Sequence, residues 1–564
     1  MKKALRNIFK YWIAGLCLGL LISCTPPEKV KPDKTKQVKT AVSTENKRFY
    51  IKDLLVPGSH FHGIHGLTFD KENRLYAGSV IGMATYLIDT EIGSVETFIG
   101  PPNGMADDLE FGPDGTLFWT SYLLGKVHTM DADGKIKVLA EGLPGINSLA
   151  FKQDGRLFAT QVFLGDALYE IDVNGKNPPR KIMEKMGGLN GFDFGPDGML
   201  YGPLWFKGVI AKVNVDTGTL ETVASGFKVP AAANFDSAGN LWVVDTALGE
   251  VVKVNVNSGE KEVVARVKTS IDNLALDSND NLYISNMADN GIYQIDTQTG
   301  KVRTVVEGKL SVASGLDVFS ADGEDTLYLA DLFAYRSING NTGEVTDLAR
   351  MQADKLEYPF SARVNEKTVL LSSWFTGTVH VLDRVTGQTV EMIHGLQAPH
   401  DALALPNGGY LVAELGTGSL VKLSGEHGKD RTVVIDKLVG PYGLTWAGND
   451  AVYLSEVFAG MISRIDLKTG QKTVIASGLK FPEGIDTAPD GKIIVAEVGL
   501  KQLISIDPAS GAVTKIAGGL KIGFPGTPGL LPSGIPTGVG VSSDGAIYVT
   551  SDIENAIYKF TPVN

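Results

Sequence analysis

The amino-acid sequence predicts an all-β chain that folds as two consecutive six-bladed β-propellers. One unit recurs twelve times: an apolar strand, a turn that contains Gly, a second strand, a Gly-rich turn, a third strand that ends near Asp, a TG or SG turn, and a fourth strand. Neighbouring units lie about 41 residues apart, and this spacing is typical of propeller blades. The 3.6-residue period of an amphipathic helix is absent after residue 47.

The two ends of the repeat array predict how the rings close. The last unit ends after its third strand (AIYKFTPVN), whereas the first is preceded by an isolated fourth strand (FYIKDLLVPG). If each unit is taken to begin with the fourth strand, the chain contains twelve complete four-stranded units. Six of these units close a ring when the leading strand pairs with the trailing three. We therefore expect strand exchange in each propeller, at residues 48–300 and 301–564. A single twelve-bladed ring and a division into seven and five blades are the alternatives.

The first 23 residues have the pattern of an export signal. Four basic residues lie among the first ten, an apolar run covers residues 11–22, and the segment LISC ends at Cys24. This segment resembles a bacterial lipobox, which implies cleavage before Cys24 and acylation of that cysteine. An ordinary secretory leader with a chance cysteine is the alternative. Residues 24–47 are rich in Pro, Lys, Ser and Thr, and we expect them to form a lipidated flexible tether.

Composition excludes several function classes for the body of the chain. The only cysteines are Cys17 and Cys24, so residues 48–564 contain no disulfide and no thiol chemistry. The same residues carry 42 basic and 61 acidic side chains, which leaves the body far more negative than the net charge of −12 of the whole chain. A strongly acidic body repels phosphate backbones, so we expect no nucleic acid partner.

The residues just before each innermost strand should line the central channel, because propeller connectivity places these positions on one face around the axis. In the N-terminal propeller they are His65, Asp107, Asn147, Asn190, Ala231 and Asp272. Carboxylate and amide oxygens from several blades suit a divalent cation that prefers oxygen, such as Ca²⁺. The alternative is that Asp and Asn only satisfy backbone N–H groups where a loop enters a strand.

The loop before the first inner strand holds three of the eight histidines of the chain. It reads SHFHGIH over residues 59–65, and His62 and His65 are the candidates for catalysis. A neutral imidazole at a channel mouth can act as a general base or bind a transition metal. The alternative is a loop that is rich in histidine without a function.

The C-terminal propeller has a different ring and a second candidate site. The aligned residues are Ser314, Phe360, Asp401, Tyr442, Glu483 and Thr537, and His400 is adjacent; His400, Asp401, Tyr442 and Glu483 form the candidate site. The ends of the second strands add Asp331, Glu414, Glu456, Glu497 and Asp552, for which we favour a solvated acidic rim over cation attraction. The Gly- and Pro-rich insertion at residues 521–534 is expected to be a lid or a docking surface.

Short motifs give the two halves different resemblances. With NGFDF at residues 190–194 and PDG at 196–198, the N-terminal half resembles the gluconolactonase/regucalcin superfamily, whose relatives include paraoxonase and strictosidine synthase. With PEGI at 482–485 and VAE at 495–497, the C-terminal half is similar to the NHL-repeat and virginiamycin-B-lyase group. The first resemblance implies a divalent cation held by an Asn, an Asp and a Glu. Asn190 matches the Asn, Asp272 matches the Asp without its following Gly, and His65 occupies the Glu position.

Two kinds of function are open at this point. As an enzyme, the chain would be a metal-dependent hydrolase of lactones or esters: a cation on Asp107, Asn147, Asn190 and Asp272 would polarise the carbonyl, and His65 or His62 would deprotonate water. As a binding protein, it would hold a protein partner, a small molecule or a carbohydrate at the cell surface. Lyase chemistry of the virginiamycin-B type in the C-terminal propeller is the third possibility.

The leader predicts a location in the cell envelope, with the membrane as a partner through the N-terminal lipid. The residue after Cys24 is Thr25, whereas enteric lipoproteins retained at the inner membrane carry Asp there. We therefore expect the outer membrane in a Gram-negative host, and otherwise the extracellular face of the cell membrane.

Overall fold

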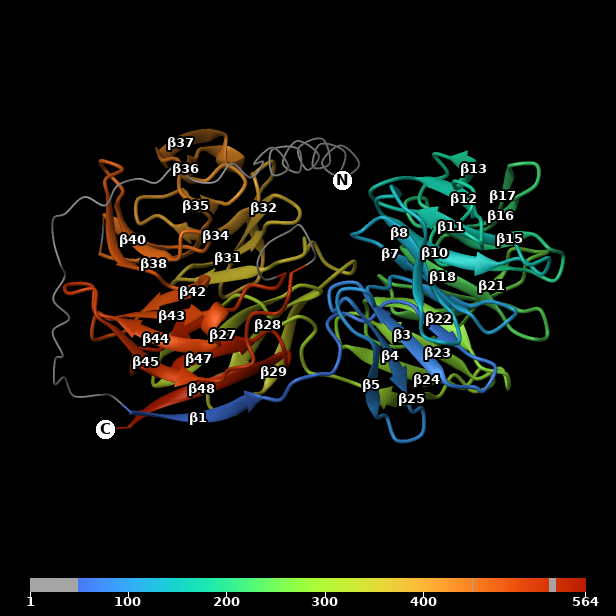
Figure 1. Ribbon diagram of the computed structural model, residues 1–564, viewed down its shortest axis with the longest axis horizontal. Coiled ribbons are helices and arrows are strands. Elements are labelled where there is room, and N and C mark those ends of the chain that lie inside the picture. The colour runs from blue at the N-terminus through green and yellow to red at the C-terminus, as the bar shows by residue number, and fades with distance from the viewer. Residues whose placement is uncertain (1–48, 449, 527–533, 564) are drawn as a thin grey trace.

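The computed structural model describes residues 49–448, 450–526 and 534–563. These residues form 48 β-strands in twelve four-stranded antiparallel sheets, with two single-turn 3₁₀ helices at Glu426–Gly428 and Val498–Leu500. The twelve blades confirm the predicted fold class of two six-bladed β-propellers (Figure 1). Within these ranges no helix is long and apolar enough to cross a membrane. The predictions for residues 1–23, for the tether at 24–47 and for Cys24 lie outside the described residues.

The N-terminal propeller consists of six blades of four consecutive strands, and its innermost strands contact one another in the ring order β2-β6-β10-β14-β18-β22. Its strands are β2 Leu67–Phe69, β3 Leu75–Ser79, β4 Ala84–Ile88, β5 Val95–Ile99, β6 Leu109–Phe111, β7 Leu117–Ser121, β8 Lys126–Met130, β9 Ile136–Ala140, β10 Ile146–Phe151, β11 Leu157–Gln161, β12 Ala167–Ile171, β13 Arg180–Glu184, β14 Asp193–Phe194, β15 Leu200–Leu204, β16 Val209–Asn214, β17 Thr219–Ser225, β18 Pro230–Phe235, β19 Leu241–Asp245, β20 Glu250–Val254, β21 Lys261–Arg266, β22 Ile271–Leu276, β23 Leu282–Asn286, β24 Gly291–Ile295 and β25 Val302–Val306.

The C-terminal propeller repeats this arrangement, with the inner ring β26-β30-β34-β38-β42-β46. Its strands are β26 Leu316–Ala321, β27 Glu324–Asp331, β28 Ala334–Asn339, β29 Val345–Arg350, β30 Ser361–Val364, β31 Thr368–Ser373, β32 Thr378–Asp383, β33 Thr389–Ile393, β34 Pro399–Ala404, β35 Tyr410–Glu414, β36 Ser419–Ser424, β37 Asp430–Ile435, β38 Pro441–Trp446, β39 Ala451–Glu456, β40 Met461–Asp466, β41 Lys472–Ser477, β42 Pro482–Thr487, β43 Ile493–Glu497, β44 Gln502–Ile506, β45 Val513–Gly518, β46 Val539–Val541, β47 Ile547–Ser551, β48 Ala556–Val563 and, from the start of the chain, β1 Phe49–Val56.

Burial along each blade explains why these segments form strands. Most of the second strands, such as β19 (LWVVD), are buried along their whole length, because neighbouring blades cover both of their faces. The outermost strands, such as β21 (KEVVAR), expose most of their side chains and carry charges. The TG or SG turns that join the third and fourth strands place glycine at positive φ, as at Gly218 with φ of 70°. Local sequence therefore fixes each blade.

Closure of the rings differs from the prediction. Strand β1 pairs with β48, so the N-terminal strand completes the last blade of the C-terminal propeller, and Figure 1 shows it below the strands of that half. Strand β25 pairs with β24, so the N-terminal propeller closes without an exchanged strand, and the predicted boundary after residue 300 separates two paired strands. The prediction of strand exchange in each propeller is therefore wrong: one exchange joins the two ends of the chain. Since every other blade already has four consecutive strands, only the last one leaves an edge for β1.

Buried carboxylates link neighbouring innermost strands. In five blades an Asp of the inner strand accepts a hydrogen bond of 2.7 to 3.3 Å from a backbone N–H of the next inner strand. An innermost strand has no ladder partner on its channel side, so these carboxylates satisfy backbone groups that would otherwise be buried without a partner. The residues are Asp108, Asp193, Asp317, Asp401 and Asp486.

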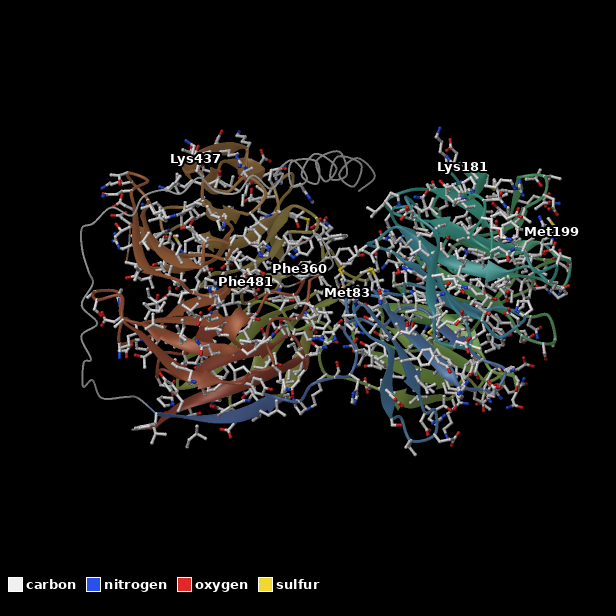
Figure 2. All side chains as sticks on the ribbon, viewed as in Figure 1. Met83, Lys181, Met199, Phe360, Lys437 and Phe481 are labelled. Carbon is white, nitrogen blue, oxygen red and sulfur yellow. The ribbon has the colours of Figure 1, made fainter. Side chains whose placement is uncertain are left out.

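The two propellers pack against each other through an apolar cluster and a buried arginine. Met83 and Phe360 belong to the same buried cluster, and Figure 2 shows both where the two halves meet. Arg350 of β29 reaches into the N-terminal propeller. There its guanidinium donates to both carboxylate oxygens of Asp289, at 2.8 and 2.9 Å, and to the carbonyl of Thr269 at 2.8 Å. The interface is therefore both apolar and specifically paired.

Replacing Arg350 by Met should destabilise the protein by about 3 kcal/mol, because it leaves the carboxylate of Asp289 buried without its main cationic partner. The free energy of unfolding from chemical denaturation measures this change. Arg266→Met is the matched control, because Arg266 also pairs with a carboxylate, that of Glu250 at 2.7 Å, but is two-thirds exposed. An exposed pair contributes less than about 1 kcal/mol. Equal losses in the two variants would contradict a role of Arg350 in joining the propellers.

Candidate functional site

Three of the predicted residues come together at the channel mouth of the N-terminal propeller. His65 Nδ1 lies 3.1 Å from Asp272 Oδ2 and 3.8 Å from Asp107 Oδ1. The three residues come from three different blades, in the loops or strand ends that lead into β2, β6 and β22. His65 Nε2 is buried, and no described residue forms a hydrogen bond with it. One imidazole nitrogen is thus held by a carboxylate while the other is available for a ligand or water.

The protonation of this cluster is sensitive to its surroundings. Burial disfavours the charged form of His65, but the hydrogen bond to Asp272 and the charges of Asp272 and Asp107 outweigh burial and raise its pKa above the ordinary value. Burial raises the pKa of Asp107 to about 7, although the charge of His65 opposes this shift. The two carboxylates therefore favour the protonated form of His65, whereas burial favours the protonated form of Asp107.

The four predicted metal ligands do not form one group. Asp107 and Asp272 contact His65, whereas Asn147 and Asn190 meet through Ser148, whose hydroxyl lies 2.9 Å from Asn147 Oδ1 and 3.1 Å from Asn190 Oδ1. No group of three or more His, Cys, Asp or Glu side chains in the described part of the chain could hold a metal ion. The imidazole of His65 contacts the two carboxylates, those of Asp107 and Asp272, that a cation would need. A divalent cation at these four residues therefore stays a prediction.

His62 lies away from this cluster, at the contact between the propellers. Its Nε2 is 2.7 Å from the backbone carbonyl of Asp552, and its ring packs against Phe524 with centroids 4.7 Å apart. Burial lowers the pKa of His62 to about 4, so the imidazole is neutral at physiological pH. No contact joins it to His65 in the described structure, and we assign it to the interface rather than to the site.

The C-terminal propeller covers the mouth of the N-terminal channel. Phe333 of the C-terminal half contacts the ring of His65 edge-on, with centroids 5.5 Å apart, and Tyr358 packs against Phe333 at 6.0 Å. Gly63 makes the close approach possible: its φ is 72°, and a Cβ there would lie 2.3 Å from the Phe333 ring. Burial, with the charges of Asp272 and Asp107 nearby, raises the pKa of the Tyr358 phenol. The site therefore belongs to both propellers.

The second candidate site lies in the channel of the C-terminal propeller, and its register differs from the prediction by one residue. His400, not Asp401, occupies the position that Tyr442 and Glu483 take in their blades, because each follows the proline that pairs with the last residue of the second strand. His400 stacks on Tyr442 with ring centroids 3.9 Å apart. Glu483 accepts a hydrogen bond of 2.8 Å from the backbone N–H of Thr537.

Asp401 has a structural role. It forms a buried ion pair with Arg363, with Nη2 2.7 Å from Oδ2, and also accepts hydrogen bonds from Ser361 Oγ at 2.9 Å and from the backbone N–H of Leu444 at 2.9 Å. A carboxylate with this many donors has little capacity left for a ligand. Asp401 instead holds neighbouring inner strands together.

The carboxylates at the second-strand ends are buried, so the expectation of a solvated acidic rim is wrong. Each is at most 3% exposed and accepts hydrogen bonds from backbone N–H groups in the loop that leads into the inner strand of its own blade. These loops would otherwise bury unpaired donors, which is why the carboxylate recurs from blade to blade. The five residues are Asp331, Glu414, Glu456, Glu497 and Asp552.

Sequence reasoning missed four residues that shape the two sites. Asp108 and Asn273 form a second layer below the ring, with Asn273 Nδ2 3.1 Å from Asp108 Oδ1. The signal for this second layer was a pair of adjacent polar residues, DD at 107–108 and DN at 272–273. The first residue of each pair lies in the ring and the second lies in the layer below it. Arg363 is a lone basic residue in an apolar inner strand, which is itself a sign of a buried partner. Nothing in the local pattern indicates Tyr358, because it reaches the site from the other propeller.

Comparisons with known proteins find matches among solved structures alone. No protein-family model matches the chain, and no curated protein matches it. Among solved structures, a catalytically inactive virginiamycin B lyase from Staphylococcus aureus, solved with quinupristin, is 16% identical over 50% of this chain and 96% of that one, with a TM-score of 0.37. A gluconolactonase from Xanthomonas campestris is 16% identical over 42% and 86%, with a TM-score of 0.35.

A third solved structure covers both halves of this chain. The extracellular domain of a putative hybrid two-component system from B. thetaiotaomicron is 11% identical over 90% of this chain and 70% of that one, with a TM-score of 0.34. With TM-scores below 0.4, these three likenesses carry no argument about the present chain. The chemistry of the present chain has to be argued from its own residues.

Proposed function

We propose that the chain is a hydrolase of lactones or esters whose acid–base site is His65, Asp107 and Asp272 at the mouth of the N-terminal channel. One observation carries the proposal: Nδ1 of His65 is held by Asp272, whereas Nε2 is buried and has no partner among the described residues. A carboxylate that orients an imidazole through one nitrogen leaves the other nitrogen as a general base.

The geometry supports a simple sequence of proton transfers. Nε2 of His65 takes a proton from a water molecule while the water oxygen bonds to the substrate carbonyl carbon. The carboxylate of Asp272 stabilises the imidazolium that forms. When the bond from the carbonyl carbon to the alcohol oxygen breaks, that oxygen takes a proton from Asp107, whose pKa of about 7 leaves it partly protonated near neutral pH. The imidazolium of His65 then loses its proton and the carboxylate of Asp107 regains one, which returns both groups to their starting states. The products are a carboxylic acid and an alcohol.

Hydrolysis should not depend on a divalent cation. We expect the body of the protein, residues 48–564, to hydrolyse a member of a panel of lactones and aryl esters, and to keep at least about half of this activity after EDTA treatment and gel filtration, since none of the steps above uses a metal. Elemental analysis of the same sample should find far less than one Ca²⁺, Mg²⁺, Mn²⁺ or Zn²⁺ per chain.

The outcomes separate the two versions of the site. Loss of activity with EDTA and its recovery with Ca²⁺ would favour the cation site predicted at Asp107, Asn147, Asn190 and Asp272, for which calcium stays a prediction. Absence of turnover on the whole panel would count against a hydrolase and favour a binding protein. Attachment to the membrane through Cys24 and a location in the cell envelope also stay predictions.

A further inference from the structure

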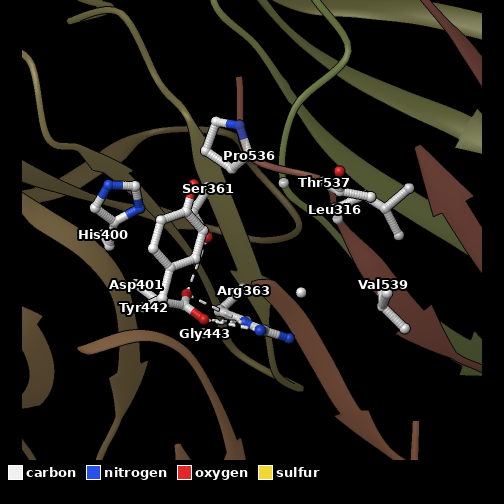
Figure 3. Close-up of a pocket in the computed structure, with 13 residues that line it drawn as sticks. Leu316, Ser361, Arg363, His400, Asp401, Tyr442, Gly443, Pro536, Thr537 and Val539 are labelled. Atoms are coloured by element: carbon white, nitrogen blue, oxygen red, sulfur yellow. Dashed lines mark hydrogen bonds and ion pairs between the residues drawn. The ribbon is translucent and has the colours of Figure 1, made fainter. Parts of the chain in front are cut away.

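The pocket in the channel of the C-terminal propeller is too small for an organic ligand. Figure 3 shows it between His400 and Tyr442 on one side and Thr537 on the other, and it has room for one or two water molecules. A further binding function is therefore to be expected on the outer surface of the molecule rather than in this channel.

Strand β1 carries the largest group of exposed apolar side chains among the outermost strands. Phe49, Ile51 and Leu54 are 69%, 58% and 54% exposed. Each of the other eleven outermost strands exposes at most one large apolar side chain in the described structure. Apolar side chains are more stable out of water, and a group of exposed ones marks a surface that contacts a partner. Strand β1 is therefore a candidate interaction surface.

Two of these side chains form a patch with the last described residue of the chain. Strand β1 is at the edge of its sheet, where Phe49 is opposite Val563 of β48, which is 47% exposed. Opposite residues of an antiparallel pair lie on one face of the sheet, as do alternate residues of one strand, so Phe49, Ile51 and Val563 share a face. We call these three residues the rim patch, because β1 is an outermost strand (Figure 1).

The chain next to the rim patch is basic, although the protein as a whole is acidic. Residues 25–52 carry eight basic and three acidic side chains, whereas the whole chain has a net charge of −12. Lys52 is exposed on β1 itself. Basic side chains beside exposed aromatic and aliphatic ones fit a bilayer with anionic headgroups over an apolar interior. The basic residues are Lys29, Lys31, Lys34, Lys36, Lys39, Lys47, Arg48 and Lys52, and the acidic ones are Glu28, Asp33 and Glu45.

The position of the rim patch in the chain favours the same partner. Phe49 follows Cys24, the residue predicted to carry the lipid, by 25 positions (49 minus 24). A lipid at Cys24 would hold β1 near the bilayer, and a contact that is weak in free solution would then form readily, because it would be intramolecular in effect. A short connection of this kind makes a modest apolar patch sufficient for docking.

We propose that the rim patch docks on the surface of a membrane that contains anionic lipid. Phe49, Ile51 and Val563 enter the boundary between headgroups and acyl chains, and the neighbouring basic residues attract the anionic headgroups. The C-terminal propeller thus contacts the bilayer through its rim and not through a channel mouth. The proposal does not depend on the hydrolase site.

Co-sedimentation of residues 25–564 with vesicles tests the proposal without a lipid on the protein, because this chain lacks Cys24 and keeps every described strand. The vesicles consist of phosphatidylcholine alone or with about one third phosphatidylglycerol. We expect at least about 10-fold stronger binding to the anionic vesicles, and less of this preference in high salt, which screens the basic residues. Anionic vesicles should also slow hydrogen exchange in β1 and leave β2 to β5 unchanged.

A pair of substitutions tests the rim patch itself. Phe49→Ser with Ile51→Ser removes two apolar side chains and keeps every basic residue, so binding to anionic vesicles should weaken about 10-fold. Val390→Ser with Val433→Ser is the matched control and should bind like the wild type, since these side chains are 58% and 52% exposed on the outermost strands β33 and β37 of the same propeller. Both double variants should keep their melting temperature, because the replaced side chains are mainly exposed.

Three outcomes would overturn the proposal. The first is that the wild-type chain shows no preference for the anionic vesicles. The second is that Phe49→Ser with Ile51→Ser binds as well as the control. The third is a dimer of the wild-type chain that this double variant dissociates, since a second copy would then cover the rim patch. His65→Gln should bind vesicles like the wild type, so a failure of the proposed hydrolase would leave this result unchanged.

Discussion

Replacing His65 by Gln should lower the turnover of a lactone or aryl ester by about 10²- to 10⁴-fold, because Gln cannot take a proton from water. The amide keeps a donor near Asp272, so the fold and the binding of substrate should change little, and the loss should appear in kcat rather than in KM. In the wild-type protein the rate should rise with pH as His65 loses its proton, with a midpoint above the ordinary pKa of 6.5, since Asp272 and Asp107 favour the protonated ring. It should fall again as Asp107, whose pKa is about 7, loses the proton that the alcohol oxygen takes, so the profile should be bell-shaped. Initial rates between pH 5 and 9 measure both effects.

Two further variants define the roles in this site. Asp272 is a positioning residue, so Asp272→Asn should lower kcat and also move the midpoint of the pH profile down, because the imidazolium loses its carboxylate partner. His380→Gln is the control: His380 is buried in β32, the third strand of a blade of the C-terminal propeller, and its Nε2 lies 2.8 Å from Thr389 Oγ1. The assignment of His65 is wrong if His65→Gln retains more than about a third of the wild-type kcat.

Removing strand β1 should destabilise the C-terminal propeller and spare the N-terminal one. A chain that begins at residue 57 lacks the seven cross-strand pairs between β1 and β48 and the fully buried side chain of Val56. Burial of this side chain alone contributes about 1.5 kcal/mol, and the exposed edge of β48 adds a further cost. We expect the unfolding midpoint of the C-terminal half to fall by more than about 5 °C in calorimetry.

Hydrogen exchange locates the effect. The control is a chain that begins at residue 48, which keeps β1 and differs only by the eight strand residues and their flanking positions. Amides of β46 to β48 should exchange faster in the shorter chain, whereas those of β22 to β25 should be unchanged. Faster exchange in β24 would contradict the observed closure, because β24 is the strand that β1 would meet if each propeller exchanged its own strand.

The fold could be predicted from sequence because each blade is encoded locally. Turns such as the one at Gly218 need glycine at positive φ, and the mainly apolar second strands mark segments that are covered on both faces. Twelve copies of the same signals leave little doubt about the number of blades. The pairing of β1 could not be predicted in the same way, because an outermost strand has the same pattern whichever blade it completes.

The ring of channel residues was predictable, but its chemistry was not. Alignment placed His65, Asp107 and Asp272 on one axis, and the structure brings both carboxylates within 4 Å of His65 Nδ1. Asn147 and Asn190 share the ring, yet they bond to Ser148 instead of joining the carboxylates. Side-chain partners at this scale depend on rotamers and on small shifts between blades, which the repeat pattern does not contain.

The sequence by itself determined the twelve blades and most of the residues that face each channel, since each blade follows from contacts within about 40 residues of chain. Only the tertiary structure decided that β1 completes the last blade, that Phe333 and Tyr358 cover the mouth of the other propeller, and that His400 and Thr537 meet in one pocket. These contacts join residues hundreds of positions apart. Their energies come from shape and desolvation at surfaces that exist only once both propellers have formed.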